Sequence, residues 1–455
     1  MFFRTRFRRG ASEAVVPGWT PRDDGDAAGS DDRRAAHALF LLHTHRGDPA
    51  REIDALLAAE PRSTPGHSLR AALIVGADDH AARSPLARSI AVLEAGPRGV
   101  DARARRHAAA ARAWLDGDAA LSLSRYGDIV VDAPRDILAL VVAHALDFRL
   151  GRRRMLRDRV AQVLPEWNAS MAGYASILAM YAFGLEENGQ YRRAERAARK
   201  ALDLDPGHPG AIHALAHVME MQGRAREGGA FLDATRSQWM QGNGFSVHLA
   251  WHRALFHLDL DDPRAALDAY DTTIAPARGL AALADASALL WRLELRDVDV
   301  SGRWQSLADH WQRQPLLGAR PFYAVHAMMA YAAAGRAASV REVFDMFQGS
   351  TGGTSLLLPE EALGRPLCEA LVAFARHDYA LCIERLREVR DIAHRCGGSL
   401  AQCDVIHLTF TEAALRAREP RLARALVAER AARKPGSRFN QRLLARVGLV
   451  MPAGA

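Results

Sequence analysis

A short stretch near the middle of the chain constrains the fold more than any other part of the sequence. Between Ser176 and Pro206, small and apolar residues recur at helical spacing on both sides of Gly189, as in two helices joined by a tight turn. The positions that carry this pattern are Leu178, Ala182, Leu185, Gly189, Tyr191, Ala194, Ala198, Ala201, Leu202, Leu204 and Pro206. A helix pair of about 34 residues cannot bury its apolar face alone, so this unit predicts that similar pairs stack beside it.

The rest of the sequence has the same organisation. From Ala35 onward, apolar residues recur with the period of a helix, no segment alternates as a strand does, and Gly or Pro separates successive segments. Helix pairs are predicted at residues 35–60, 62–95, 103–134, 137–164, 175–206, 209–240, 247–275, 281–315, 321–347, 363–395 and 401–434. We therefore predict an all-α fold in which tetratricopeptide-like helix-turn-helix repeats form an α-solenoid, or superhelix.

Glycine marks the turn inside several of these pairs. A residue with positive φ often ends a helix, and glycine adopts that conformation without a steric penalty. The glycines that we expect in such turns are Gly76, Gly117, Gly151, Gly189, Gly223 and Gly335.

The sequence predicts one long domain with a short segment at each end. Residues 1–31 combine clustered arginines with prolines and an Asp-rich run and lack helical spacing, which is typical of a disordered leader. No break in composition interrupts residues 32–440, so we predict a single α-solenoid domain there. Residues 441–455 are predicted to form a short C-terminal tail.

Composition limits the classes of function. The apolar fraction of 49% and the charged fraction of 25% are those of a globular protein, and the absence of a long apolar run predicts no membrane span. The net charge of +7 comes from arginines scattered beside acidic residues, so we expect no nucleic-acid partner. The four cysteines have no CxxC spacing and follow no secretory signal, which favours a reduced, cytoplasmic location.

Two histidine pairs follow the tetratricopeptide-like unit. His213 and His217 lie four residues apart, as do His248 and His252 on the first helix of the next pair. Residues at this spacing share one face of a helix, and neighbouring helices pack about 10 Å apart, so the two pairs can converge on a single ion. Glu220 follows one turn after His217, within reach as a further ligand or a general base. Neither pair has the internal Glu of an HExxH motif, which excludes a zinc protease of that type.

Further polar residues fall on the same side of the repeats. When the first helix of each pair is phased by its apolar positions, one side faces the concave groove that such repeats use for binding. The residues placed there are His67, His107, His213, His217, Glu220, His248, Trp251, His252 and His326. Asp285 is predicted either to orient a groove histidine or to form a solvated ion pair with Arg292.

At these residues the chain resembles a bacterial member of the tetratricopeptide repeat protein 38 family, over a region from about Ala35 to Ser437. The stretches that carry the resemblance include Tyr181-Ala-Phe-Gly-Leu185, His213-Ala-Leu-Ala-His217, Glu220-Met221, Trp251-His252, Asp285, Arg292-Leu293, Gly302-Arg-Trp304, Gly397-Gly-Ser399 and Asp404-Val405. The resemblance implies a repeat fold more than an activity, although an oxidative role has been suggested for a bacterial branch associated with specialised-metabolite gene clusters. It also implies that His67, His107, His144 and His326 occupy positions where similar members carry histidine.

These observations support two functions of different classes. The first is a His-lined concave pocket that binds a small polar or aromatic ligand, with a divalent metal (iron, zinc or manganese), and acts on it by oxidative or hydrolytic chemistry. Its candidate metal ligands are His213, His217, His248 and His252; its candidate catalytic residues are His217, Glu220 and His252; and its candidate ligand-binding residues are His67, His107, His144, Trp251, Asp285, His326 and Asp404. The second is a scaffold whose groove binds a partner protein or peptide. The sequence leaves open whether the protein is an enzyme.

Overall fold

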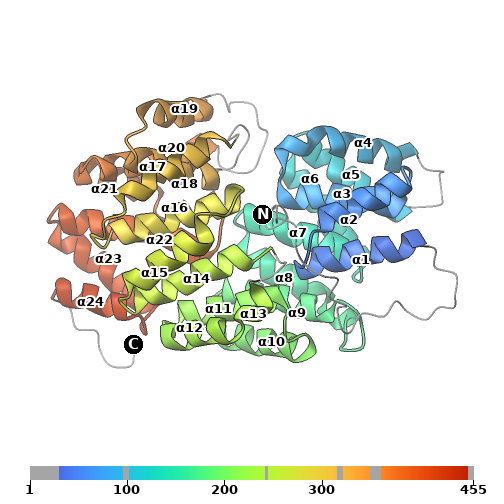
Figure 1. Ribbon diagram of the computed structural model, residues 1–455, viewed down its shortest axis with the longest axis horizontal. Coiled ribbons are helices and arrows are strands. Elements are labelled where there is room, and N and C mark those ends of the chain that lie inside the picture. The colour runs from blue at the N-terminus through green and yellow to red at the C-terminus, as the bar shows by residue number, and fades with distance from the viewer. Residues whose placement is uncertain (1–29, 96–101, 241–243, 315–320, 349–359, 449–455) are drawn as a thin grey trace. The chain divides into compact units, whose positions relative to one another are not determined.

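The computed structural model describes residues 30–95, 102–240, 244–314, 321–348 and 360–448. Throughout these ranges the chain is helical, with 24 α-helices, a few short 3-10 or π segments and no β-strand (Figure 1). None of the described helices is both long enough and apolar enough to cross a membrane. Apart from the first residues of α1, the leader predicted at residues 1–31 lies outside the described part of the chain.

The helices follow one another as the repeat pattern predicts. They are α1 (Ser30–Thr44), α2 (Pro49–Ala59), α3 (Thr64–Ala77), α4 (Arg83–Ala95), α5 (Ala102–Leu115), α6 (Ala119–Asp132), α7 (Ile137–Arg149), α8 (Arg153–Val163), α9 (Tyr174–Glu186), α10 (Tyr191–Leu204), α11 (Pro209–Met221), α12 (Ala225–Ala234), α13 (Arg236–Trp239), α14 (Ser246–Asp259), α15 (Pro263–Ala269), α16 (Leu280–Glu294), α17 (Ser301–Gln312), α18 (Pro321–Ala333), α19 (Ala337–Gln348), α20 (Glu360–Ala375), α21 (Tyr379–Val389), α22 (Leu400–Arg416), α23 (Pro420–Arg433) and α24 (Arg438–Arg446). Each predicted pair coincides with consecutive helices, and the all-α, tetratricopeptide-like α-solenoid class is confirmed. Helix α24 crosses the boundary that the sequence places at residue 440.

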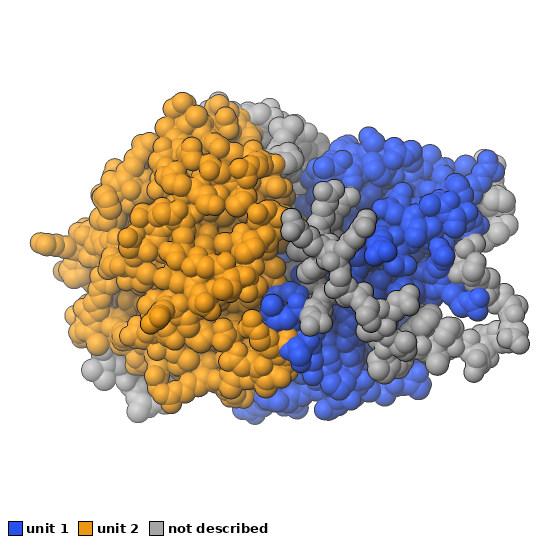
Figure 2. All heavy atoms as spheres, viewed as in Figure 1, with its two compact units in different colours: residues 1–148, 152–214, 237–246 blue, residues 149–151, 215–236, 247–455 orange. Residues whose placement is uncertain are grey.

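Contacts within the chain divide it into two compact units, which Figure 2 shows in different colours. Unit 1 comprises residues 1–148, 152–214 and 237–246, and unit 2 comprises residues 149–151, 215–236 and 247–455. The boundary runs through α11, so the N-terminal part of this helix belongs to unit 1 and its C-terminal part to unit 2.

Helix α16 is the central element of unit 2. Most of its residues are buried, and it contacts α17, α18 and α22. Side chains on α16 tie these neighbours to it by hydrogen bonds: the Trp291 indole donates to Thr409 on α22 over 2.9 Å, and Ser287 accepts from the Trp311 indole on α17 over 2.9 Å. Because each indole has only one donor, these buried bonds fix how the helices face one another.

The turns follow the glycine prediction with one exception. Gly117, Gly151, Gly189, Gly223 and Gly335 all have positive φ, between 63° and 93°. Gly76 does not: it lies within α3, and Asp78 takes the left-handed conformation at the end of that helix, with φ of 54°. Asp tolerates this region better than most residues because its short side chain bonds locally. The turn therefore comes two residues later than predicted.

Gly184 on α9 serves a different purpose, which is close packing against α8. A Cβ added to Gly184 would lie 2.4 Å from the carbonyl oxygen of Leu156. Backbone atoms cannot rotate away as a side chain can, so only glycine fits this contact.

The variant Gly184→Ala should therefore lower the free energy of unfolding by about 1–3 kcal/mol, because α8 and α9 must move apart. The matched control is Gly76→Ala on α3, where no described atom lies within 4 Å of an added Cβ, and alanine's helix propensity should leave stability unchanged or slightly raised. Urea unfolding followed by circular dichroism measures both. Equal effects of the two substitutions would contradict the close-packing account.

Candidate functional site

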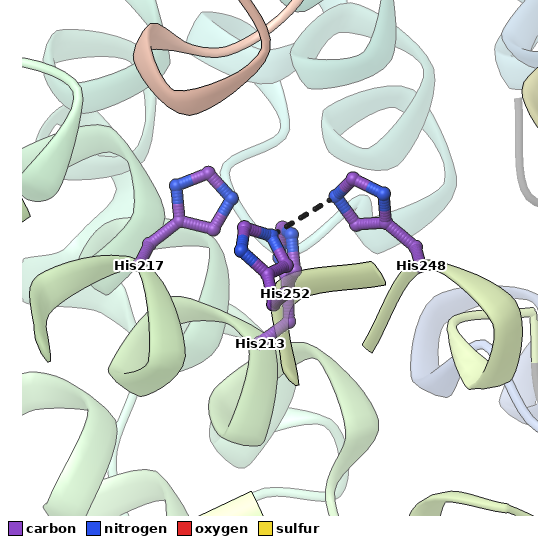
Figure 3. Close-up of side chains that lie close together, drawn as sticks. All are labelled: His213, His217, His248 and His252. Atoms are coloured by element: carbon purple, nitrogen blue, oxygen red, sulfur yellow. Dashed lines mark hydrogen bonds between the residues drawn. The ribbon is translucent and has the colours of Figure 1, made fainter. Parts of the chain in front are cut away.

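Three buried histidines of unit 2 lie together where α11 and α14 meet. His217 and His252 are 0% exposed and His248 is 4% exposed. One nitrogen of each ring lies within 4.8 Å of the other two, and the His252 ring centroid is 4.4 Å from that of His217 and 4.6 Å from that of His248 (Figure 3). The i, i+4 spacing on α14 places His248 and His252 on one face, as the sequence predicts. We call His217, His248 and His252 the histidine cluster.

His213 comes one helical turn before His217 on α11. The boundary between the two units falls between these two residues. Within unit 1, the His213 ring packs against Phe183 and Phe245, with centroid distances of 5.5 Å and 4.6 Å. The three members of the cluster itself all belong to unit 2.

Two carboxylates hold two of the rings in place. Glu220 accepts a hydrogen bond from Nδ1 of His252 over 2.8 Å, and Asp285 on α16 accepts one from Nδ1 of His248 over 2.8 Å. An ionised carboxylate can only accept, so both Nδ1 atoms carry a proton, and in the neutral form of each ring Nε2 carries the lone pair. These two Nε2 atoms face each other at 3.2 Å. Facing lone pairs repel unless a proton or a metal ion lies between them.

Aromatic and cationic groups surround the cluster. The indole of Trp251 stacks on His248 with a centroid distance of 5.1 Å and an interplanar angle of 13°. The guanidinium of Arg292 lies 5.3 Å from the centre of the same indole. Burial lowers the pKa of His252 well below its ordinary value, and the neighbouring cationic groups act in the same direction. His252 is therefore neutral near pH 7, and the neutral ring is the form that binds metal ions.

The burial of these residues differs from the sequence prediction, which places them along a concave groove. Trp251 is 0% exposed, and its ring lies between His248 and Arg292, so it forms a wall of the cluster and offers no open stacking surface. Glu220 is 6% exposed and is held by His252. The repeat phase gives only the direction in which a side chain points. It does not show that segments distant in sequence cover that side.

Asp285 and Arg292 do not form the solvated ion pair that is one of the two predicted alternatives. Both side chains are buried, at 3% and 2% exposure. Asp285 orients His248, and Arg292 donates to the carbonyl oxygens of Ala288 and Ala401 over 3.1 Å and 2.7 Å. The structure thus agrees with the other alternative, in which Asp285 positions a histidine.

Two further candidate residues of unit 2 have partners of their own. Nδ1 of His326 donates to the carbonyl oxygen of Phe322 over 2.6 Å, and burial lowers the pKa of His326 to about 4. Asp404 accepts from Arg430 over 2.7 Å and 3.2 Å. Burial acts to raise the pKa of Asp404, but Arg430 outweighs it and holds that pKa below its usual range. A ligand-binding role for either residue stays a prediction.

The three candidate histidines of unit 1 also have separate surroundings. His67 bonds through one nitrogen to the Ser89 hydroxyl and through the other to the Pro61 carbonyl, over 3.1 Å and 2.9 Å. His107 donates a hydrogen bond to the carboxylate of Asp136. Burial lowers the pKa of His144 to about 4. These contacts support helix packing in unit 1, and a role in ligand binding stays a prediction for all three.

Two residues outside the predicted site set, Lys434 and Gln402, support the cluster. Nζ of Lys434, just after α23, lies 3.8 Å from the second oxygen of Glu220. Gln402 on α22 lies with its amide nitrogen 3.5 Å from Asp285. Gln402 carries a readable local signal, because Ser399 and Gln402 form a capping box that starts α22. No local pattern relates Lys434 to a residue more than two hundred positions earlier.

Asp136 joins several polar contacts of unit 1. Its side chain is 2% exposed, accepts from His107 over 2.9 Å and from Arg103 over 2.6 Å and 2.8 Å, and caps α7 by accepting from the backbone N–H of Ala139. Burial acts to raise the pKa of Asp136, but the bonds from His107 and Arg103 outweigh it and hold the pKa below the usual range.

The variant Asp136→Asn should lose about 1–3 kcal/mol of unfolding free energy at pH 7, because the buried His107 ring and the half-exposed Arg103 guanidinium lose their charged acceptor. A carboxyl with a depressed folded-state pKa contributes stability above its unfolded pKa of about 3.9 and loses it as pH falls toward the folded value. The difference in unfolding free energy between wild type and Asp136→Asn should therefore become smaller below about pH 4. Urea unfolding at pH 7 and at pH 3 measures this, with the exposed Asp128→Asn as control; a gap that does not depend on pH would contradict the account.

Comparison with known proteins agrees with the repeat fold. Residues 185–238 match the family model described as a tetratricopeptide repeat, and this segment contains α10, α11 and α12 and therefore His217 and Glu220. The narrower resemblance to the tetratricopeptide repeat protein 38 family stays a prediction.

Similar solved structures include other helical-repeat proteins. The match to the APC/C hetero-tetramer Cut9–Hcn1 covers 92% of this chain and 73% of that chain, with 13% sequence identity and a TM-score of 0.45. The match to the human IFIT1 dimer with m7Gppp-AAAA covers 92% of this chain and 95% of that chain, with 11% sequence identity and a TM-score of 0.37. The match to the P58(IPK) TPR domain covers 74% of this chain and 96% of that chain, with 14% sequence identity and a TM-score of 0.21. At these TM-scores the similarity does not extend to function.

Proposed function

We propose that unit 2 of this helical-repeat protein binds one divalent transition-metal ion through His217, His248 and His252. The observation that carries the proposal is the pair of Nε2 atoms of His248 and His252, which face each other at 3.2 Å. Two nitrogens that each lie about 2.0–2.1 Å from one tetrahedral ion are separated by about 3.3 Å. The observed spacing therefore suits two ligands of the same ion.

The contacts on the far side of each ring support the same function. Histidines that bind a metal usually donate their other N–H to a carboxylate or a carbonyl, which fixes the tautomer and increases the basicity of the ligating nitrogen. Glu220 and Asp285 have this relation to His252 and His248. A proton shared between the two rings would also relieve their repulsion. The third imidazole, with a nitrogen within 4.8 Å of the other two, favours the metal because it supplies another ligand.

The ligand types narrow the choice of ion. Imidazole nitrogens suit zinc, iron, copper and nickel, whereas manganese prefers carboxylate and water oxygens. Among the three ions considered from the sequence, zinc and iron therefore fit this set better than manganese.

Three protein ligands leave one tetrahedral position for water or a small ligand, the arrangement that catalytic zinc sites use. Two polar groups beside the cluster would suit such a ligand. The Trp251 indole N–H is buried without a hydrogen-bond partner among the described residues. No described carboxylate lies within ion-pair distance of Arg292, whose side chain donates to the carbonyl oxygens of Ala288 and Ala401. We infer that the ion binds a small polar ligand there, and Glu220, already bonded to His252, positions that ring instead of acting as the base.

Capture of a partner protein or peptide is the second function that the sequence allows. The tetratricopeptide match at residues 185–238 supports it. Such a partner would have to use exposed residues, because the histidine cluster and Trp251 are buried.

Elemental analysis of the full chain, purified without a His tag and equilibrated with Zn²⁺ or anaerobic Fe²⁺, tests the proposal. We expect about one ion per chain in the wild type and none in His217→Ala/His252→Ala, because the double variant leaves one ligand. The matched control is His257→Gln, a half-buried histidine on α14 outside the cluster, which should keep the ion. A wild type that stays free of metal, or a double variant that binds as much as the wild type, would sink the proposal.

The two carboxylates allow a finer test. Asp285→Asn and Glu220→Gln should each weaken metal affinity by about 10–100-fold, because each variant replaces the charged acceptor that fixes a ligating ring by a neutral amide oxygen. Competition with a chromophoric chelator measures the affinity, and thermal melting of the metal-free chain reports on folding. Variants that lower the melting temperature but leave the affinity unchanged would show that these carboxylates act only in packing.

A further inference from the structure

A second site lies in unit 2, apart from the histidine cluster. It is a partly enclosed cavity of about 270 Å³. Its walls come from the ends of α14 and α16, from α22 and from α24. Drug-sized ligands occupy cavities of about 300–1,000 Å³, so a small molecule of roughly one ring fits this volume.

Three arginines and three acidic residues line the cavity, and one of these arginines forms no ion pair with an acidic residue of the lining. Arg442 pairs with Asp261 over 2.7 Å, and Arg446 pairs with Glu412 over 3.0 Å. The third acid, Asp297, pairs over 2.9 Å with Arg416 from outside the lining. Arg416 also pairs with Glu412 over 3.0 Å, so every acid of the lining is engaged by an arginine other than Arg296.

Arg296 is the arginine that remains. Its Nη1 donates to the carbonyl oxygen of Arg292 over 2.8 Å, and no carboxylate lies within ion-pair distance of it among the described residues. Its Nε–H is buried and has no hydrogen-bond partner in the same part of the chain. A buried donor without a partner costs about 1–3 kcal/mol, and more on a charged group, so a ligand that accepts from it gains this free energy.

Aromatic packing holds this guanidinium in position. The Arg296 guanidinium lies 3.9 Å from the ring centre of Phe439 on α24, and that of Arg442 lies 5.9 Å from the same centre. Burial, followed by the nearby Arg292 and Arg430, lowers the pKa of Arg296 to about 9. The group therefore stays charged near pH 7. The result is a fixed positive charge in a small cavity with an aromatic wall.

We propose that this cavity binds a small organic monocarboxylate, with its carboxylate on Arg296 and its apolar body against Phe439. A guanidinium matches a carboxylate because its donors form a planar fork. Leu258, Leu295 and Leu443 complete an apolar lining for the body of the ligand. The acids Asp261, Asp297 and Glu412 disfavour a dianion such as a phosphate monoester, so the site selects a single negative charge. The proposal does not depend on a metal at the histidine cluster.

Fluorine NMR titration of the full chain with 4-fluorobenzoate tests this site, with the neutral 4-fluorobenzamide and the dianionic 4-fluorophenyl phosphate as comparison ligands. We expect saturable binding of the benzoate with Kd below about 1 mM and at least about 10-fold weaker binding of both comparison ligands. Equal binding of benzoate and benzamide would overturn the proposal. So would the absence of saturable binding for benzoate, phenylacetate and butanoate alike.

Variants then locate the binding. Arg296→Gln should weaken benzoate binding by about 10-fold or more, because it removes a charged donor. Phe439→Leu should weaken it less, because the aromatic wall is lost while the charge stays. Arg438→Gln, an exposed arginine on α24 outside the cavity, removes the same charge and should change affinity less than about twofold. Benzoate binding that survives Arg296→Gln, or that Arg438→Gln weakens as strongly, would contradict the assignment.

Discussion

Two hydrogen bonds between carboxylates and imidazoles set the orientation of the buried histidine rings in unit 2. Glu220 and Asp285 each occupy one nitrogen of a histidine, which turns the other nitrogens of His252 and His248 toward each other at 3.2 Å. Without these bonds each ring could rotate or change tautomer, and the two lone pairs would no longer meet. Buried polar groups are costly unless they are satisfied, so a cluster of this kind is not what helix packing alone requires. We therefore interpret it as a site.

Helix α16 connects this cluster with the second cavity. Asp285 and Arg292 lie seven residues apart on one face of the helix, where the first orients His248 and the second covers Trp251. Arg296 follows just after the helix ends and enters the cavity beside Phe439. Indole hydrogen bonds from Trp291 to α22 and from Trp311 on α17 to Ser287 also hold α16. A buried helix thus carries polar residues of both the histidine cluster and the cavity at Arg296.

The sequence predicts those features that depend on neighbouring residues. The helix pairs could be predicted because apolar period and turn glycines are local signals, and the histidine spacing could be predicted because i and i+4 share a helix face. The exception at Gly76 is also local, since Asp78 can adopt the left-handed conformation as well, although at a higher cost than glycine. The burial of Trp251 and the contact of Lys434 with Glu220 could not be predicted, because they depend on which distant helices cover the groove side of a repeat. The cavity at Arg296 was missed for the same reason, as its walls come from four separated segments.

The central claim is that His217, His248 and His252 ligate one metal ion. X-ray absorption spectroscopy of the full chain loaded with one equivalent of Zn²⁺ tests it most directly, because imidazole ligands give a characteristic multiple-scattering pattern. The account predicts a four-coordinate ion with at least three imidazole nitrogens at about 2.0–2.1 Å. A spectrum that fits oxygen ligands alone, or an ion removed by simple gel filtration, would contradict it.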